Sequence, residues 1–189
     1  MPITCPILNG LKIVSKDRMT NGTDGPLTLE TGPCKNPLFA AFLNSTEQAG
    51  YPLTNDVNGY QQEGFGAFDR NISRGRRLSA ARAYLHPVLK NRPNLDVICR
   101  ALTTRILFDN KRAIGVEFVK GKKGSPKTVN AGEVIVCSGA INSPQVLQLS
   151  GIGNAEELKA LGIDVVHDLP GVGENMQDHL EVYVQYKSK

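Results

Sequence analysis

The passage from an apolar run through a glycine into a helix, between residues 134 and 153, constrains the fold of this chain most strongly. Residues 134–137 predict a buried strand, which Gly139 ends. Ser143 and Pro144 predict a first helical turn, because serine caps free amides and proline fits where no amide hydrogen is needed. A helix start of this kind presents backbone N–H groups that bind anionic or polar cofactor groups. The segment therefore predicts part of an α/β sheet with a ligand at this junction.

Apolar residues at helical spacing predict two helices before this segment, and a cap residue predicts one after it. The first helix begins at Asn36 and ends before Gly50, and the second covers residues 79–89. Beyond the junction, Asn154 caps a short helix that Gly162 ends.

Alternating apolar and polar residues predict an antiparallel meander of about three strands. These strands are residues 95–108, residues 114–119 and the apolar run 134–137, which is expected to be the most buried. Further short strands are expected at residues 164–167 and 180–186. Helices together with such strands predict an α+β fold that contains an α/β part.

Two segments show no clear period. Residues 1–21 are expected to form a loosely attached start, and residues 53–74 a long polar loop, which is often functional or mobile. Within this loop, Gly64 and Gly66 flank Phe65. The two glycines indicate either a close approach of the backbone to another group or a plain turn.

The composition excludes several classes of protein. A hydrophobic fraction of 40% and a charged fraction of 21% argue against disorder and coiled coil. No apolar run approaches the ~20 residues of a membrane span, and no basic-then-apolar leader opens the chain, so secretion is not expected. The net charge of +4 is mild, and the lysine-rich residues 120–127 are expected to form a solvated loop.

Motifs for metal binding and for common catalytic sites are missing from the sequence. Cys5, Cys34, Cys99 and Cys137 form no C-x-x-C pair, so reduced thiols are expected, with Cys99 and Cys137 buried in strands. The histidines share no metal-ligand spacing, and neither a P-loop nor a G-x-S-x-G nucleophile motif occurs. No metal site is therefore expected. The G-x-G pairs at residues 151–153 and 171–173 remain open between a binding role and tight turns.

Two longer motifs resemble one known family. Residues 139–153 read G-A-I-N-S-P-Q-V-L-Q-L-S-G-I-G and resemble the second signature of the glucose–methanol–choline (GMC) flavoprotein oxidoreductases. Residues 169–179 read L-P-G-V-G-E-N-M-Q-D-H and resemble another hallmark of that family. The resemblance extends from about residue 24 to residue 185. Several stretches are most similar to the choline-oxidising members: residues 48–52, 58–66, 75–85 and 108–117.

The resemblance implies an enzyme that holds FAD on a Rossmann-like domain and covers the flavin with a substrate domain. Such enzymes transfer a hydride from an alcohol to the flavin, here from choline to give betaine aldehyde in glycine betaine synthesis. The chain resembles the central part of such a protein. Residues 1–22 are then a poorly ordered start, residues 23–94 part of the substrate (cap) region, and residues 95–189 the meander with part of the FAD-binding domain.

The family's N-terminal G-x-G-x-x-G and its C-terminal segment with the catalytic histidine have no counterpart in this sequence. His179 belongs to the second hallmark and is not that base, so no catalytic residue is assigned. The chain alone is therefore expected to be inactive.

The resemblance also assigns residues to the cofactor. The main chain of Thr103 is expected beside the adenine, and Ser138, Gly139 and Ala140 beside the adenosine half of FAD. Arg77 and Ser79, together with Arg76, fall in a segment that approaches the flavin and the substrate cavity in the family.

One departure and the remaining alternatives concern the partners. Choline-oxidising relatives often carry a carboxylate where this chain has Lys187, and a cation there repels choline. The alternatives are another GMC alcohol oxidoreductase or a non-catalytic anion-binding module built on the arginines of residues 70–82. The expected partner is a small alcohol and not a nucleic acid, with the electron acceptor left open. A cytoplasmic location or a peripheral one at the inner membrane is expected.

Overall fold

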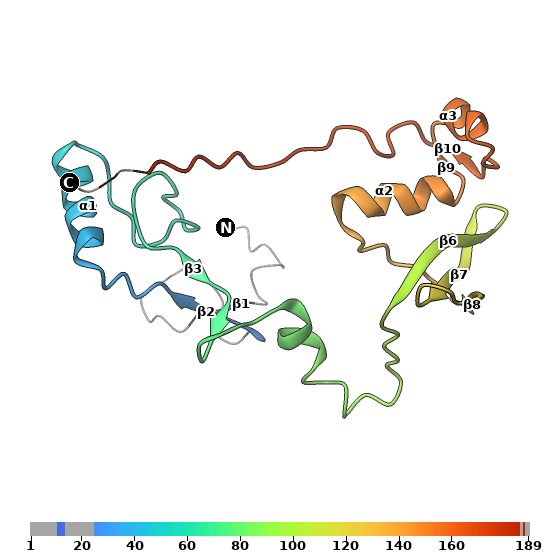
Figure 1. Ribbon diagram of the computed structural model, residues 1–189, viewed down its shortest axis with the longest axis horizontal. Helices are drawn as coiled ribbons and strands as arrows, with labels where there is room; N and C mark the ends of the chain where they lie inside the picture. The colour runs from blue at the N-terminus through green and yellow to red at the C-terminus, as the bar shows by residue number, and fades with distance from the viewer. Residues whose placement is uncertain (1–10, 14–24, 186, 188–189) are drawn as a thin grey trace, which may run out of the picture. The chain divides into compact units, whose positions relative to one another are not determined.

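The computed structural model describes residues 11–13, 25–185 and 187 of the chain (Figure 1). The chain divides into two compact units, Met1–Asp96 and Val97–Lys189. Within the described residues, no helix combines the length and the apolar character needed to cross a membrane. The predicted loose start at residues 1–21 lies outside the described residues, except for residues 11–13, which form a strand.

The first unit contains a small mixed sheet. Strand β2 (Leu27–Thr31) pairs in parallel with β1 (Leu11–Ile13) and antiparallel with β3 (Asp69–Arg70). A tight hairpin follows, formed by β4 (Ile72–Ser73) and β5 (Arg76–Arg77). The prediction that residues 53–74 are irregular was therefore wrong in part, because these strands are only two residues long and carry no readable alternation.

Helix α1 (Pro37–Gln48) confirms the first predicted helix. Asn36 caps it by accepting a hydrogen bond from the backbone N–H of Leu38 at 3.0 Å, and Pro37 occupies the first helical position, which needs no amide hydrogen. The apolar side chains on this helix remain largely open: Leu38 is 69% exposed. Phe42 packs edge-on against the ring of Phe65, with ring centroids 5.7 Å apart.

The pair Gly64 and Gly66 lies against the chain's own backbone. A Cβ atom on Gly66 would overlap the carbonyl oxygen of Thr54, and one on Gly64 would lie 2.8 Å from that of Pro52. The N–H of Phe65 donates to Pro52 O at 2.9 Å, and its carbonyl accepts from Thr54 N at 2.9 Å. The two glycines thus permit a close approach of two segments of this loop.

The second predicted helix, residues 79–89, was wrong in kind. The structure has a short π-helical segment, η2 (Ala81–Leu85), followed by turns. His86 N–H donates to the carbonyl of Ala81 at 2.8 Å, five residues back. Pro87 carries no N–H and cannot continue an α-helical ladder, which accounts for the early end.

The second unit is built on a three-stranded antiparallel meander in the order β6-β7-β8 (Figure 1). Its strands are β6 (Ala101–Asp109), β7 (Arg112–Lys120) and β8 (Pro126–Asn130). The predicted first strand starts six residues too early, because Arg100 has a positive φ of 56° that interrupts extended backbone. The lysine-rich turn between β7 and β8 is exposed, as predicted.

Helix α2 (Gly139–Leu149) packs beside strand β6 of this meander, and a smaller helix packs against the strand that follows α2. Strand β9 (Ile152–Gly153) follows α2 and pairs in parallel with β10 (His167–Asp168), so the strand predicted at 164–167 lies three residues later. Between them, α3 (Ala155–Ala160) confirms the predicted cap, since Asn154 Oδ1 accepts from Glu156 N at 3.0 Å. The buried apolar side chains of this unit are Ile106, Phe118, Val146 and Leu158.

The third strand of the meander is β8 and not residues 134–137, so that prediction was wrong. Residues 134–137 form no strand, and Ile135 is 78% exposed. The predicted strand at the chain end is also not formed over residues 180–185, where Leu180 is 99% exposed, and Tyr186 lies outside the described residues. Strands require a hydrogen-bonded neighbour, and no described strand lies along either segment.

The predicted burial of the cysteines was wrong as well. Cys99 and Cys137 are exposed, because residues 97–100 and 134–137 are not in strands. Cys34 is half-buried, and Cys5 lies outside the described residues.

Candidate functional site

The start of α2 forms an open turn. Ser138 is the N-cap, but its side chain makes no hydrogen bond to the helix; its N–H instead donates to Ser143 Oγ at 3.1 Å. The helix begins five residues before the predicted position, and Pro144 lies inside it. Ser143 is thus a residue of the helix and not its cap, but its hydroxyl accepts a hydrogen bond from the N–H of Ser138, the N-cap residue.

Gly139 gives this turn its shape. Its φ is +88°, in the left-handed region that glycine adopts most readily. A Cβ atom added there would meet no other atom within 4 Å. Ser138, Gly139 and Ala140 are all exposed, so the positive end of the helix is accessible at these three residues.

A groove of about 760 Å³ runs along α2 beside this turn. One wall comes from α2, with Ala140, Ser143 and Pro144 among its residues, and the other wall is residues 172–177. Gln148 joins the two walls, because its Nε2 donates to Val172 O at 3.2 Å. Both G-x-G pairs lie near this side chain: a Cβ on Gly153 would come within 3.2 Å of it, and one on Gly173 within 3.1 Å.

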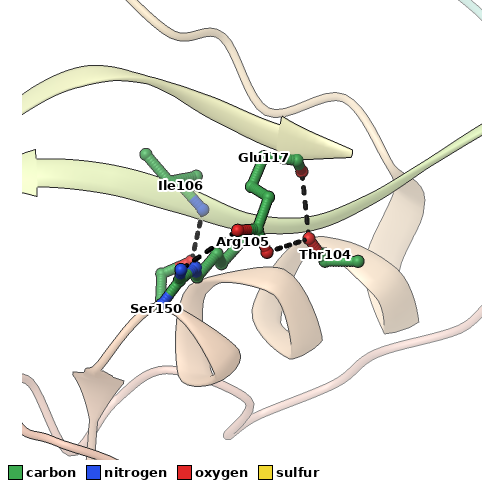
Figure 2. Close-up of polar contacts among 5 residues, drawn as sticks. All are labelled: Thr104, Arg105, Ile106, Glu117 and Ser150. Atoms are coloured by element: carbon green, nitrogen blue, oxygen red, sulfur yellow. Dashed lines mark hydrogen bonds and ion pairs between the residues drawn. The ribbon is translucent and has the colours of Figure 1, made fainter. Parts of the chain in front are cut away.

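Ser150 fastens α2 to the meander (Figure 2). Its Oγ accepts from the N–H of Ile106 on β6 at 2.8 Å and donates to Val146 O at 2.5 Å. Ser150 is 7% exposed, so this hydroxyl satisfies a buried amide on β6, which is an edge strand of the sheet that the described residues form. The start of α2 and the strand that carries Thr103 therefore belong to one packed unit.

A Ser150→Ala variant is expected to lower the free energy of unfolding by about 1–3 kcal/mol, because it leaves the buried N–H of Ile106 without an acceptor. Urea denaturation measures this difference. Ser45→Ala is the matched control, since Ser45 Oγ also donates to a helix carbonyl, that of Phe42, but is exposed. The control is expected to stay within ~0.5 kcal/mol of the unchanged protein. Equal losses in the two variants would contradict the role of Ser150.

Thr103 lies on β6 opposite Phe118, and its side chain is exposed. Directly after it, the pairing register shifts between Thr103 and Arg105, which leaves Thr104 as the extra residue of a β-bulge. Glu117 on β7 binds both residues that follow Thr103. The hydrogen bond from Thr104, and then that from Arg105, lowers the pKa of Glu117 below its ordinary value, so this carboxyl is ionised at neutral pH.

Arg77 and Ser79 lie in the first unit and are both exposed. Arg77 is on β5, and its carbonyl accepts from Arg82 Nη1 at 3.5 Å. Ser79 Oγ accepts from Arg82 N at 3.4 Å just before η2. The structure thus places Thr103, Ser138, Gly139 and Ala140 in one unit, and Arg77 and Ser79 in the other.

Sequence reasoning missed three residues of this arrangement: Glu117, Gln148 and Ser150. Ser150 lies inside the motif of residues 139–153, and Glu117 occupies an outward position of an alternating strand. The sequence therefore did not indicate a hydrogen-bonding role for either side chain. Within the described part of the chain, no group of three or more His, Cys, Asp or Glu side chains could hold a metal ion.

A family model described as GMC oxidoreductase matches residues 9–181 of the chain. The chain belongs to the GMC oxidoreductase family. The resemblance drawn from residues 139–153 and 169–179 is therefore confirmed.

Similar curated proteins carry the name choline dehydrogenase. The oxygen-dependent choline dehydrogenase of Cronobacter sakazakii is 58% identical over 172 residues, which cover 89% of this chain and 31% of that protein. The mitochondrial choline dehydrogenase of Homo sapiens is 57% identical over 164 residues, covering 87% of this chain and 27% of that protein. The chain thus spans less than a third of the length of these family members.

Solved structures of similar proteins confirm the predicted fold class. A pyridoxine 4-oxidase from Mesorbium loti matches with a TM-score of 0.77 and 28% identity, over 87% of this chain and 32% of that one. An FAD-dependent oxidoreductase from Chaetomium thermophilum matches with the same TM-score and identity, over 87% of this chain and 31% of that one.

Proposed function

We propose that this chain is part of an FAD-dependent alcohol oxidoreductase that oxidises choline to betaine aldehyde. The observation that carries the proposal is the open turn at Gly139, with a φ of +88° and no atom within 4 Å of an added Cβ, directly before Ala140, which lines the groove of about 760 Å³. The turn lies at the head of α2, where the helix dipole and unpaired amides favour a polar group. These features fit the adenosine half of FAD, and the identity to choline dehydrogenases supports choline as the substrate.

The residues of this chain would bind and orient the cofactor. The main chain of Thr103 would contact the adenine, and Ser138, Gly139 and Ala140 would lie against the adenosine. Arg77 and Ser79 would approach the flavin and the substrate cavity. The bound flavin supplies the chemistry, because it accepts the hydride from the alcohol carbon. No catalytic base is assigned to this chain.

A second candidate is an alcohol oxidoreductase of the same family with another substrate. Lys187 favours it, because the resemblance implies a carboxylate at this position in choline-oxidising relatives, and a lysine there would repel the quaternary ammonium of choline. The anion-binding alternative has less support, because two arginines of residues 70–82 are already engaged: Arg70 pairs with Glu30 at 3.3 Å, and Arg82 binds the carbonyl of Arg77.

The full-length protein that contains this chain is expected to show flavin absorbance and to reduce a dye when choline is added. A neutral alcohol of similar size, tested in parallel, separates the two substrate hypotheses. The 189-residue chain alone is expected to show no turnover and to bind FAD more weakly than micromolar, because it spans less than a third of its relatives. A full-length protein without flavin would overturn the proposal, and micromolar or tighter FAD affinity of the chain alone would contradict the second expectation.

A further inference from the structure

The β-bulge on β6 directly follows the residue proposed to contact the adenine. Thr103 pairs with Phe118 and Arg105 with Glu117, so Thr104 is left over in β6. A bulge bends its strand and changes the direction of the neighbouring backbone groups. The direction of the Thr103 main chain therefore depends on what holds the bulge.

Glu117 holds the bulge with both of its carboxylate oxygens (Figure 2). Thr104 Oγ1 donates to Oε1 at 2.8 Å, and Arg105 Nη2 donates to Oε2 at 3.0 Å. Thr104 Oγ1 also lies 3.2 Å from the carbonyl oxygen of Glu117. The side chain of Glu117 is 19% exposed while that of Arg105 is 55% exposed, so the carboxylate is the more sheltered partner.

Ile106, the next residue along β6, is hydrogen-bonded to the C-cap of α2, since its N–H donates to Ser150 Oγ. Thr104, Arg105 and Ile106 therefore each make a hydrogen bond to a residue outside β6. Thr104 and Arg105 are both tied to the same carboxylate on β7, whereas Ile106 is tied to α2. This succession fixes the backbone after Thr103 relative to the helix that begins with Gly139.

We propose that Glu117 is a positioning residue for the adenosine end of the cofactor. It acts through the bulge: its two hydrogen bonds set the direction of the Thr103 main chain, which contacts the adenine. This inference rests on the proposed function. It makes a specific demand, since loss of Glu117 must weaken binding of the adenosine half and leave the flavin half untouched.

The test compares FAD with FMN, which carries the same flavin but no adenosine, in titrations of the full-length protein. Glu117→Gln keeps the size of the side chain and removes its charge, and it is expected to weaken FAD binding about tenfold. Its affinity for FMN is expected to be unchanged. Glu133→Gln is the control, because Glu133 is an exposed acid of the same unit that makes no hydrogen bond or ion pair with the described residues.

A second pair of variants guards against a folding defect. Thr104→Val removes the hydroxyl at constant size and is expected to lower FAD affinity, whereas Thr104→Ser keeps the hydroxyl and is expected to restore it. Equal losses for FAD and FMN, or unchanged FAD affinity in Glu117→Gln, would overturn the positioning role alone. A wild-type protein that binds neither flavin would overturn the proposed function and this inference with it.

Discussion

A Gly139→Ala variant of the full-length protein is expected to bind FAD at least about tenfold more weakly than the unchanged protein. The added methyl group would occupy the open space above the turn at the head of α2, where the adenosine is proposed to lie. The substitution also strains the backbone, because a φ of +88° costs an L-residue about 1–2 kcal/mol. Titration with FAD and a melting curve measure the two effects separately.

Gly162→Ala is the matched control for this experiment. Gly162 also has a positive φ, +73°, and an added Cβ there also meets no atom within 4 Å. It follows the C-cap of α3 and is not one of the groove-lining residues. Both variants are expected to lose similar thermal stability, but only Gly139→Ala to lose FAD affinity. If the two variants lost FAD affinity equally, the turn at Gly139 would have no special relation to the cofactor.

A Gly151→Ala variant is expected to lose more than ~3 kcal/mol of unfolding free energy, through backbone strain together with a steric overlap. Gly151 has a φ of +84°, and a Cβ there would overlap the carbonyl oxygen of Asp164. The overlap cannot be relieved by rotating a side chain, because the obstacle is backbone. The carbonyl of Gly151 accepts from Val166 N at 2.8 Å and from His167 N at 3.1 Å. A shift of the Gly151 backbone would therefore also weaken these two hydrogen bonds, which hold the chain at the start of β10 beside β9.

Urea denaturation tests this prediction, with Gly121→Ala as its control. Gly121 lies in the exposed turn after β7, has a φ of +75°, and would meet nothing within 4 Å with a Cβ. The control therefore carries the strain without the overlap, and about 1–2 kcal/mol of loss is expected. Equal losses of unfolding free energy in the two variants would contradict the prediction, because they would show that the backbone of Asp164 moves away from the added methyl group at no cost.

Elements with local signals could be predicted from the sequence. Asn36 and Asn154 stand directly before their helices, and a cap acts on amides two or three residues away, so a short window contains the whole signal. Residues 134–137 carry an equally strong strand pattern but form no strand. Strand formation depends on a neighbour that can lie anywhere in the sequence, and a window around these residues does not contain it.

The same distinction applies to the candidate site. A break at Gly139 and a helix after it were predicted from adjoining signals in the sequence, but the strand expected before the glycine is not formed and the helix begins at Gly139 itself. The hydrogen bond from Ile106 to Ser150 joins residues 44 positions apart, and that from Thr104 to Glu117 joins residues 13 apart. A polar residue on a strand reads as solvent-facing unless its partner is known, so Glu117 gave no separate signal.

The extended segments at residues 134–137 and 180–185 have a practical consequence for work with the separate chain. Both present apolar side chains and have no strand partner among the described residues, and this combination is a template for pairing between molecules. Copies of the separate chain can therefore associate with one another through these segments. A longer polypeptide that covers both segments would suppress such self-assembly.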